Sequence, residues 1–484
     1  MGLLGILVGL GLLVLLAYRG WSVLLLAPGA ALVAALFAGE PLLAHWTETF
    51  MGSAGRFVAQ FFPIFLLGAV FAKLMEDSGA VAAIADWLTA KLGAGRAMLA
   101  VVIAGAAVTY GGVSLFVAYF VLAPMAVALF RAADIPRRLM PAAICLGSST
   151  FTMSALPGSP AIPNAIPTAF FGTTPFAAPG LGIVAAAVMA AIGMWWLNRA
   201  EAAARARGEG FGDDRPGAAE AAADDPIVRE RAVASRDFDP AEIHRSPAAA
   251  AGPPILFAAL PLIVVVVVNL LMSLVILPRI DTGFLAEPRF GGITLASVAG
   301  VWSVATALLA AILVHLALNG RRVPVLRATM DAGANAAVLP VLSVGSLVGF
   351  GAVVAAMPAF AVVRDWVLGI GGGPLVSLAV ATNVLAALTG SASGGLTIAL
   401  DALGPTYMAL AAERGIDPGL LHRIAVIGAG TLDILPHNGA IITLLAVCGC
   451  THRESYLDIA MVAIVSSIAA LVAVIVLGSL FGSF

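Results

Sequence analysis

The sequence predicts an all-α membrane protein that crosses the bilayer many times, because its composition and its long apolar segments exclude a soluble fold. Apolar residues make up 61% of the 484 residues and charged residues only 11%, with a mean hydropathy of +1.04. Soluble domains carry about a quarter charged residues. Apolar runs of roughly 18 or more residues recur, each long enough to cross about 30 Å of hydrocarbon as a helix. Continuous apolar runs favour helices over the alternating strands of a membrane barrel.

Apolar windows predict five transmembrane helices on each side of a hydrophilic segment. They lie at 2–18, 22–38, 57–76, 138–156 and 177–198, and then at 253–277, 292–318, 333–355, 420–446 and 457–481. The segment between them, 201–250, is rich in Ala, Arg, Asp, Glu and Pro and cannot bury enough surface to offset its ordering entropy. We therefore expect a hydrophilic linker between a first membrane repeat (1–200) and a second membrane repeat (251–484).

Two further apolar segments, about 98–130 and 374–411, are too long for one crossing. Small polar residues interrupt them, at 109–114 (Thr-Tyr-Gly-Gly-Val-Ser) and at 389–395 (Thr-Gly-Ser-Ala-Ser-Gly-Gly). Because each arm is short for a bilayer of about 30 Å, we expect one re-entrant hairpin in each repeat. The alternative is a pair of full crossings joined by a tight turn.

Similar landmarks follow the two interruptions. Pro124, Pro136, Gly147 and Pro157 follow the first, and Pro405, Pro418, Gly428 and Pro436 follow the second at nearly the same spacings. With five crossings in each half, the second half enters the membrane from the opposite side. The sequence therefore predicts an inverted repeat, which is the usual symmetry of alternating-access carriers.

Basic residues predict the orientation. Most Lys and Arg residues fall on the linker side of this arrangement, and cytoplasmic loops carry the excess of positive charge. We therefore expect a bacterial inner-membrane protein with its linker in the cytoplasm and both termini in the periplasm.

A broken helix follows each hairpin, at about 138–163 and at about 420–446. Proline and glycine interrupt the first at 147–160 and the second at 428–439, because proline removes a helical donor and clashes with the preceding turn. Exposed backbone at membrane depth is tolerated where it lines a cavity, so matched breaks indicate a substrate site.

The two breaks and the two hairpin tips contain no Lys or Arg. A bound carboxylate would therefore be held by N–H groups at helix N-termini and by hydroxyls, which predicts a small organic anion as the substrate. The alternative is that these small residues only pack helices closely. The candidate substrate-binding residues are Thr109, Gly111, Gly112, Ser114, Ser149, Thr150, Thr152, Ser154, Ser391, Ser393, Gly394, Thr431 and Asn438.

Asp433 and His437 are the ionisable residues deepest in the second break. Ionisable residues inside a membrane are functional hypotheses by default, and histidine titrates near physiological pH. We expect this pair to carry or gate a coupling ion, either a proton or Na⁺. The alternative is a mutual Asp–His pair that only ties down the broken helix.

The remaining ionisable residues are weaker functional candidates. Asp401 lies in the later arm of the second hairpin and is a weaker candidate. Residues near span ends are expected to be solvated, namely Glu76, Asp77, His315 and Asp331; the histidines expected in loops are His45, His244, His422 and His452.

Several other functions lack a signature in this sequence. Cys448-Gly449-Cys450 suggests either a metal site or small packing residues, and packing is favoured. No H-E-x-x-H, G-x-S-x-G or Walker motif is present, and no basic face indicates nucleic acid. We therefore expect no enzymatic activity, no cofactor and no nucleic-acid partner; membrane lipid is the expected surrounding.

The two breaks resemble the gluconate permease (GntP) family of the ion transporter superfamily. The resemblance rests on 148–160, 166–168 and 171–174 in the first half, and on 430–433 and 435–440 in the second. It implies proton-coupled uptake of hydroxy-monocarboxylates such as gluconate, related sugar acids or 3-hydroxybutyrate. It also implies an elevator, in which the hairpins and broken helices form a transport domain that moves against a scaffold within a homodimer. The His-Asn-Gly stretch at 437–439 is more similar to the 3-hydroxybutyrate-type branch.

Three other functions remain open from the sequence. The first is a sodium-coupled carboxylate carrier of the same architecture, because unwound carbonyls and hydroxyls can also hold Na⁺. The second is a passive organic-anion uniporter or channel. An intramembrane enzyme is the third, and the missing motifs argue against it.

Overall fold

The computed structural model describes residues 1–19, 21–212, 252–436 and 438–484, and every regular element in these residues is a helix. The first half contains α1 (Gly2–Tyr18), α2 (Val23–Ala38), α3 (Leu42–Ala44), α4 (Met51–Asp77), α5 (Ala80–Leu92), α6 (Ala97–Tyr110), α7 (Leu115–Ala132), α8 (Met140–Ser149), α9 (Phe151–Ser154), α10 (Ile162–Phe171) and α11 (Pro179–Ala206). A π-helical turn, His45–Phe50, joins α3 to α4.

The second half begins after the predicted linker. It contains α14 (Ile255–Leu271), α15 (Leu295–Asn319), α16 (Leu326–Ala356), α17 (Phe360–Leu368), α18 (Gly373–Thr389), α19 (Ala392–Arg414), α20 (Pro418–Leu432), α21 (Gly439–Val447), α22 (His452–Ala460) and α23 (Ser466–Phe481). The predicted all-α class is confirmed.

Seven helical segments in the described part of the chain are long and apolar enough to cross a membrane. They are Leu42–Asp77, Pro179–Ala206, Ile255–Arg279, Leu295–Arg322, Leu326–Ala356, Ala392–Arg414 and His452–Phe481. The predicted spans at 2–18 and 22–38 form the shorter apolar helices α1 and α2. The predicted spans at 138–156 and 420–446 are not continuous helices, because α8 ends at Ser149 and α20 ends at Leu432.

The arms of the second hairpin differ in length. α18 has 17 residues, whereas α19 has 23 residues and is long enough to cross a bilayer. The expectation that each arm is too short for a crossing is therefore wrong for α19. The connection between the arms is tight because Gly390 adopts φ 63° at the end of α18. Ser391 then caps α19 by accepting a hydrogen bond from the Gly394 N–H at 3.1 Å.

Residues at the start of the predicted linker are ordered. α11 continues to Ala206, so 201–206 are helical. The Phe211 N–H donates to Asp134 Oδ1 at 2.9 Å. Arg138, in the turn before α8, donates to Glu209 Oε1 and to Asp458 Oδ2, both at 2.7 Å. The hydrogen bond from Arg138 lowers the pKa of the Glu209 carboxyl below its usual value near 4.5. Residues 213–251 lie outside the described residues.

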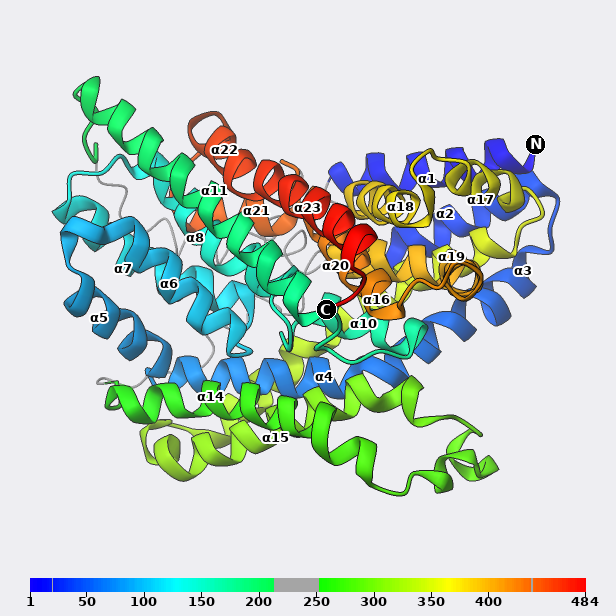
Figure 1. Ribbon diagram of the computed structural model, residues 1–484, viewed down its shortest axis with the longest axis horizontal. Helices are drawn as coiled ribbons and strands as arrows, with labels where there is room; N and C mark the ends of the chain where they lie inside the picture. The colour runs from blue at the N-terminus through cyan, green and yellow to red at the C-terminus, as the bar shows by residue number, and fades with distance from the viewer. Residues whose placement is uncertain (20, 213–251, 437) are drawn as a thin grey trace.

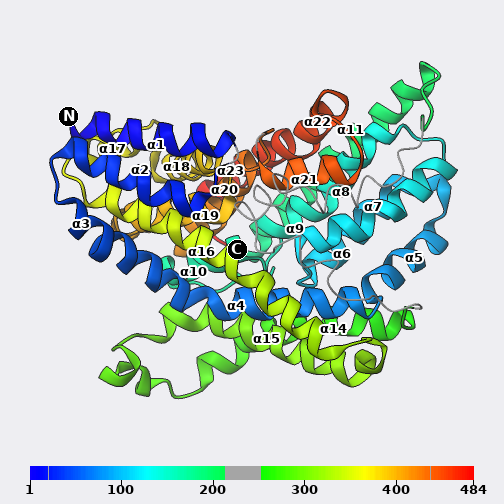
Figure 2. The same cartoon turned by 180° about the vertical axis from the view of Figure 1, so that it is seen from behind.

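The two halves have the same order of elements. Each has a helical pair (α1–α2, α14–α15), a long helix (α4, α16), a short helix (α5, α17), a helical hairpin (α6–α7, α18–α19), a broken helix (α8–α10, α20–α21) and a closing helical segment (α11, α22–α23). Their packing also matches, because α6 packs on α8 as α18 packs on α20, and α2 packs on α16 as α15 packs on α4. Figures 1 and 2 show α5–α8 at one end of the molecule and α1, α2 and α17–α19 at the other.

The long helices α4 and α16 pack against each other and run antiparallel. A Cβ added at Gly333 would lie 2.7 Å from Val70 Cα, and one added at Gly349 would lie 2.8 Å from Phe50 O. Residue numbers therefore rise along one helix as they fall along the other. Glycine at these positions lets the two backbones approach closely, as is typical of helix contacts in membranes.

Candidate functional site

The first hairpin tip is hydrogen-bonded to the first broken helix. Thr109 Oγ1 lies 3.2 Å from Thr152 Oγ1 and donates to Gly105 O at 2.8 Å. The Tyr110 hydroxyl donates to Pro157 O at 2.7 Å, inside the non-helical segment between α9 and α10. The tip therefore stays next to the break although about 40 residues separate them in the chain.

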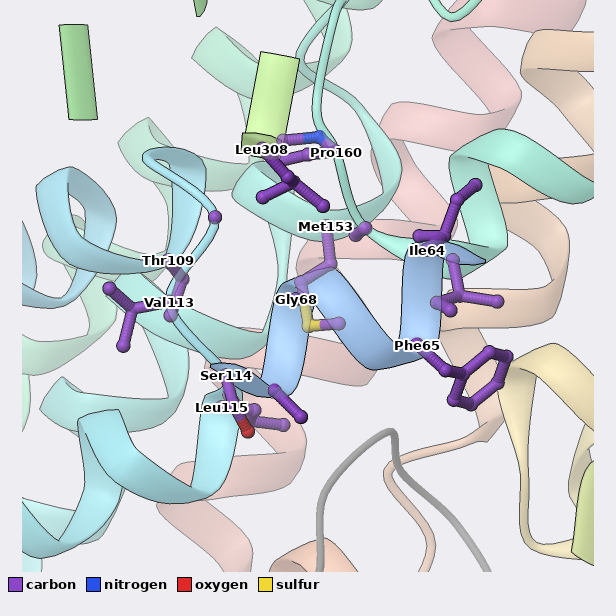
Figure 3. Close-up of a pocket in the computed structure, with 14 residues that line it drawn as sticks. Ile64, Phe65, Gly68, Thr109, Val113, Ser114, Leu115, Met153, Pro160 and Leu308 are labelled. Atoms are coloured by element: carbon purple, nitrogen blue, oxygen red, sulfur yellow. The ribbon is translucent and has the colours of Figure 1, made fainter. Parts of the chain in front are cut away.

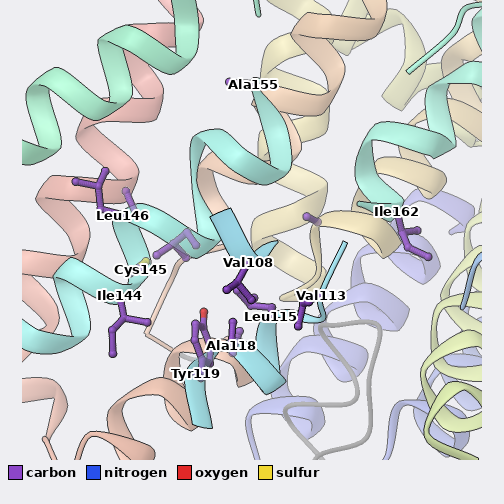
Figure 4. Close-up of a cluster of buried hydrophobic side chains, with 14 of the residues drawn as sticks. Val108, Val113, Leu115, Ala118, Tyr119, Ile144, Cys145, Leu146, Ala155 and Ile162 are labelled. Atoms are coloured by element: carbon purple, nitrogen blue, oxygen red, sulfur yellow. The ribbon is translucent and has the colours of Figure 1, made fainter. Parts of the chain in front are cut away.

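A cluster of buried apolar side chains packs around this tip and the helices next to it. Figure 4 shows Val108 and Val113 of the hairpin beside Tyr119 of α7 and Ile144 of α8. The Tyr119 hydroxyl lies 2.7 Å from Ser149 Oγ, at the last residue of α8. The cluster fixes the hairpin on the helix that leads into the break.

The second hairpin tip is hydrogen-bonded to the second broken helix in a similar way. Asn438 Nδ2 donates to Gly390 O in the tip at 2.9 Å and to Asp433 Oδ1 at 2.7 Å. Asn438 Oδ1 also accepts from the Ala440 N–H at 2.7 Å, which caps α21. Asp433 and Asn438 are both buried. His437 lies outside the described residues.

Most of the candidate hydroxyls donate to backbone carbonyls of their own helices. Thr150 donates to Leu146 O, Ser154 to Thr150 O and Thr431 to Ile427 O. A hydroxyl has only one proton to donate. In this arrangement these three hydroxyls present only lone pairs to a ligand. Each hydroxyl must therefore rotate away from its carbonyl before it can donate to an anion.

A small cavity lies between the first tip and the long helix α4. Its volume is about 60 Å³, and it is lined on one side by the tip residues Thr109, Gly112 and Ser114. Ile64 and Phe65 of α4 line the other side, with Met153 between them (Figure 3). Ala161 and Ile162, at the start of α10, and Leu308 of α15 also line it.

The structure brings together only part of the predicted set. The candidates that line the cavity are Thr109, Gly112 and Ser114. Gly111, Ser149, Thr150, Thr152 and Ser154 lie in the adjoining tip and break without lining it. The second-half candidates Ser391, Ser393, Gly394, Thr431 and Asn438 lie around the second tip and break instead.

Arg423 reaches the first break from α20, although the two breaks contain no Lys or Arg in their own sequence. Its side chain is fully buried. Nη2 donates to Ala177 O at 2.7 Å, and Nη1 donates to Ser154 O at 3.3 Å and to Asn164 Oδ1 at 3.4 Å. Among the residues that the structure describes, no carboxylate forms an ion pair with it.

His422 was expected in a loop but lies in α20, fully buried beside Arg423. Its Nδ1 lies 2.7 Å from Thr173 Oγ1 and its Nε2 lies 3.2 Å from Asn164 Oδ1. Asn164 donates through Nδ2 to Ser159 O and Pro175 O, so its oxygen faces the ring. His422 therefore donates from Nε2 to Asn164, while Nδ1 shares a hydrogen bond with the Thr173 hydroxyl whose donor depends on the tautomer. A His-Arg pair inside an apolar segment is the sequence signal for this network.

Other expectations about polar residues also change. His315 and Asp77 were expected to be solvated but are buried. Asp77 pairs with Lys73 Nζ at 3.0 Å and accepts from Thr329 Oγ1 at 2.6 Å, which joins the end of α4 to the start of α16. Asp331 is exposed, as expected.

The remaining histidines and the cysteine pair fall outside the candidate site. His45 lies in the π-helical turn rather than in a loop, His452 begins α22, and His244 lies outside the described residues. In the described ranges no group of three or more His, Cys, Asp or Glu side chains is arranged to hold a metal ion.

Long apolar helices with two broken helices, each joined to a hairpin tip, define a multi-pass membrane transporter. A model of the GntP family permeases matches residues 1–205. The chain is 41% identical, over the full length of both proteins, to the uncharacterized transporter YxjC of Bacillus subtilis (strain 168). The chain belongs to the GntP permease family.

Two further comparisons concern one segment of this chain and the fold of the whole chain. This chain is 33% identical to the high-affinity gluconate transporter of Escherichia coli (strain K12) over 140 residues. These residues make up 28% of this chain and 30% of that transporter. A solved structure of MtrF from Neisseria gonorrhoeae, described as one of a class of antimetabolite efflux pumps, aligns with a TM-score of 0.51 at 14% identity. That alignment covers 91% of this chain and 85% of MtrF, and it supports the fold alone.

Proposed function

We propose that this protein is a proton-coupled symporter that takes up a small hydroxy-monocarboxylate across the bacterial inner membrane. The substrate is 3-hydroxybutyrate, gluconate or a related sugar acid. The observation that carries the proposal is that each hairpin tip is hydrogen-bonded to the broken helix of its own half. Paired tips and breaks expose backbone groups that recognise a small ligand at membrane depth. The gluconate transporter among the relatives supports the substrate class.

The two halves form an inverted repeat in this proposal. The matching order of elements and the antiparallel contact of α4 with α16 support that symmetry. The scaffold consists of α1, α2, α4 and α14–α16, and the transport domain consists of the two hairpins and the two broken helices. The elevator movement slides the transport domain along α4 and α16, within a homodimer whose linker is cytoplasmic and whose termini are periplasmic.

Substrate and coupling ion occupy different breaks in this proposal. The anion binds at the first tip and break, where the cavity lies. At about 60 Å³ that cavity admits only a few waters, so loading requires the tip and α4 to separate. The coupling proton is carried at Asp433 in the second break, with His437 as its neighbour in sequence. Na⁺ is the alternative ion, because unwound carbonyls and hydroxyls at a helix break can also hold Na⁺.

Substrate competition in proteoliposomes tests the assignment. The purified protein is expected to accumulate labelled 3-hydroxybutyrate under an inward proton gradient, with unlabelled gluconate competing and the tricarboxylate citrate not competing. Equal competition by citrate, or no accumulation of any of the three acids, would contradict the substrate class. Passive equilibration without accumulation would identify a uniporter or channel instead.

A further inference from the structure

We propose that Arg423 supplies the fixed positive charge that balances the carboxylate of the bound substrate. The inference rests on the proposed function and deepens it, because it names the group that makes the first break selective for an anion. Its starting point is a buried cation whose hydrogen bonds are satisfied but which has no carboxylate partner among the residues that the structure describes.

The partners of Arg423 are neutral. Its guanidinium donates to the carbonyls of Ala177 and Ser154 and to the side-chain amide of Asn164. These acceptors satisfy the N–H groups, yet they leave a full positive charge in a low-dielectric interior. A buried charge without a counter-ion is costly in a protein and more so in a membrane. The chain therefore keeps a site that gains from a bound anion.

Two carboxylates flank Arg423 on α20, and no ion pair between Arg423 and either of them is present in the described residues. Asp417, the N-cap, precedes Arg423 by six residues, roughly 9 Å along the helix, and accepts from the Gly419 N–H. Asp433 follows Arg423 by ten residues, which at 1.5 Å per residue places it roughly 15 Å away along α20. Asp433 also accepts from Asn438 in the second break. Arg423 and Asp433 therefore serve different breaks, and they do not neutralise each other.

One residue of α10, Asn164, links the charge to a segment that lines the cavity. Ala161 and Ile162 at the start of α10 line the cavity, and Asn164, in the same first turn, accepts from Arg423. The hydroxyl of Ser154 donates to its own helix. In this arrangement, Arg423 is thus the source of positive charge at the first break, and Asn164 connects it to the cavity wall.

A purely structural anchor is the competing explanation, since Arg423 also holds Ala177 and Ser154 together. A binding experiment on purified protein distinguishes the effect of the Arg423 charge from the effect of its anchoring hydrogen bonds. The readout is the rise in Tm with increasing 3-hydroxybutyrate and, separately, with its neutral amide. The acid is expected to raise the Tm of the wild-type protein far more effectively than the amide.

Three variants complete the test. Arg423→Gln is expected to need at least tenfold more acid for the same rise in Tm, with the response to the amide unchanged. Arg423→Lys keeps the charge and is expected to keep the preference for the acid. Arg414→Gln, at the exposed end of α19, removes the same charge from the surface and is expected to behave as the wild type.

Each outcome decides between the explanations. An unchanged preference for the acid in Arg423→Gln overturns the proposal, and so does a loss of that preference in Arg423→Lys. Should Arg423→Gln fail to fold, Arg423→Lys alone carries the test. Wild-type protein that responds to none of 3-hydroxybutyrate, gluconate and citrate overturns this proposal together with the proposed function. Binding without accumulation overturns only the transport proposal.

Discussion

Asp433 differs from the other polar residues of the two breaks because a carboxylate can take up and release a proton without moving. It is buried, and Asn438 holds one of its oxygens at 2.7 Å. The same asparagine holds the tip of the second hairpin through Gly390. A single side chain therefore connects Asp433 to that tip.

Replacing Asp433 with Asn separates coupling from transport. The amide keeps the shape and the polarity of the side chain but cannot carry a proton. We expect Asp433→Asn to abolish proton-driven accumulation of 3-hydroxybutyrate while counterflow exchange at equal pH continues. The exposed Asp331→Asn serves as the control and is expected to keep both activities. An equal loss of accumulation and counterflow in Asp433→Asn would remove Asp433 from the coupling role.

Single residues also mark the limit of prediction from the sequence. The breaks predicted at 147–160 and 428–439 were foreseeable because proline and glycine act on their immediate neighbours. Arg423 was not placed at the first break, because its carbonyl partner Ala177 is 246 residues away in the chain. Local patterns do not encode such a contact. The apolar surroundings of Arg423 were the available signal.

At the scale of elements, glycine determines how closely the arms of the second hairpin pack. A Cβ added at Gly395 of α19 would overlap the backbone of Ala386 in α18. We expect Gly395→Ala to lower the free energy of unfolding by roughly 1–3 kcal/mol, since overpacking at a rigid contact costs that much.

Thermal unfolding in detergent measures this effect. Gly55→Ala is the matched control, because Gly55 lies inside α4 with nothing within 4 Å of an added Cβ. Alanine is the better helix former, so the control is expected to be neutral or more stable by up to about 1 kcal/mol. Equal Tm values for the two variants would show that the hairpin arms are less tightly packed than described.

The segment after α11 is held to the turn before α8 by the Arg138–Glu209 ion pair, and this contact depends on pH. Because Arg138 lowers the pKa of Glu209 in the folded protein, the stabilisation is complete above the unfolded value near 4.5. It is lost as pH falls through the lower folded value. The Glu209 side chain is 34% exposed, so solvent screens the pair and its contribution stays below about 1 kcal/mol.

Comparing Glu209→Gln with the wild type isolates this contribution. The wild-type protein is expected to have the slightly higher Tm at pH 6 to 8, and the difference is expected to shrink toward zero as the pH is lowered past the unfolded value near 4.5 and through the lower folded value. A difference that grows on acidification would reverse the sign of the argument and exclude the ion pair as its source.

Element lengths and positions were predicted unevenly. The hairpin segments and the broken helices were located because small polar residues and proline interrupt long apolar runs. The short helices α5 and α17 were missed, because their apolar residues do not form a run long enough to register as a span. The second arm of the second hairpin extends for 23 residues through Pro405, since packing against α16 and α10 overrides the local break.

At the scale of the whole molecule, the two halves share one plan but differ in charge. The first break receives Arg423 from the second half, and the second break contains Asp433. An anion at the first break and a proton at the second would together leave the moving domain less charged than either alone. In the proposed symport, this would lower the electrostatic cost of carrying both across the membrane.

The matching order of elements in the two halves was visible in the spacing of prolines and glycines, because the helices of both halves are interrupted at similar places. The difference in charge between the breaks was not foreseeable, because it depends on which half contributes the side chain. Arg423 belongs to the second half of the sequence, yet its guanidinium donates to Ser154 O at the first break. Only the packing of α20 beside α9 and α10 reveals this exchange.

Proton-driven accumulation is the central claim, and one measurement tests it most directly. Labelled 3-hydroxybutyrate is offered to sodium-free proteoliposomes under an imposed inward proton gradient, before and after addition of an uncoupler. The account predicts accumulation above the external concentration, collapse to equilibrium with the uncoupler, and no change when sodium is added. Accumulation that requires sodium, or uptake that stops at equilibrium with the gradient intact, would contradict it.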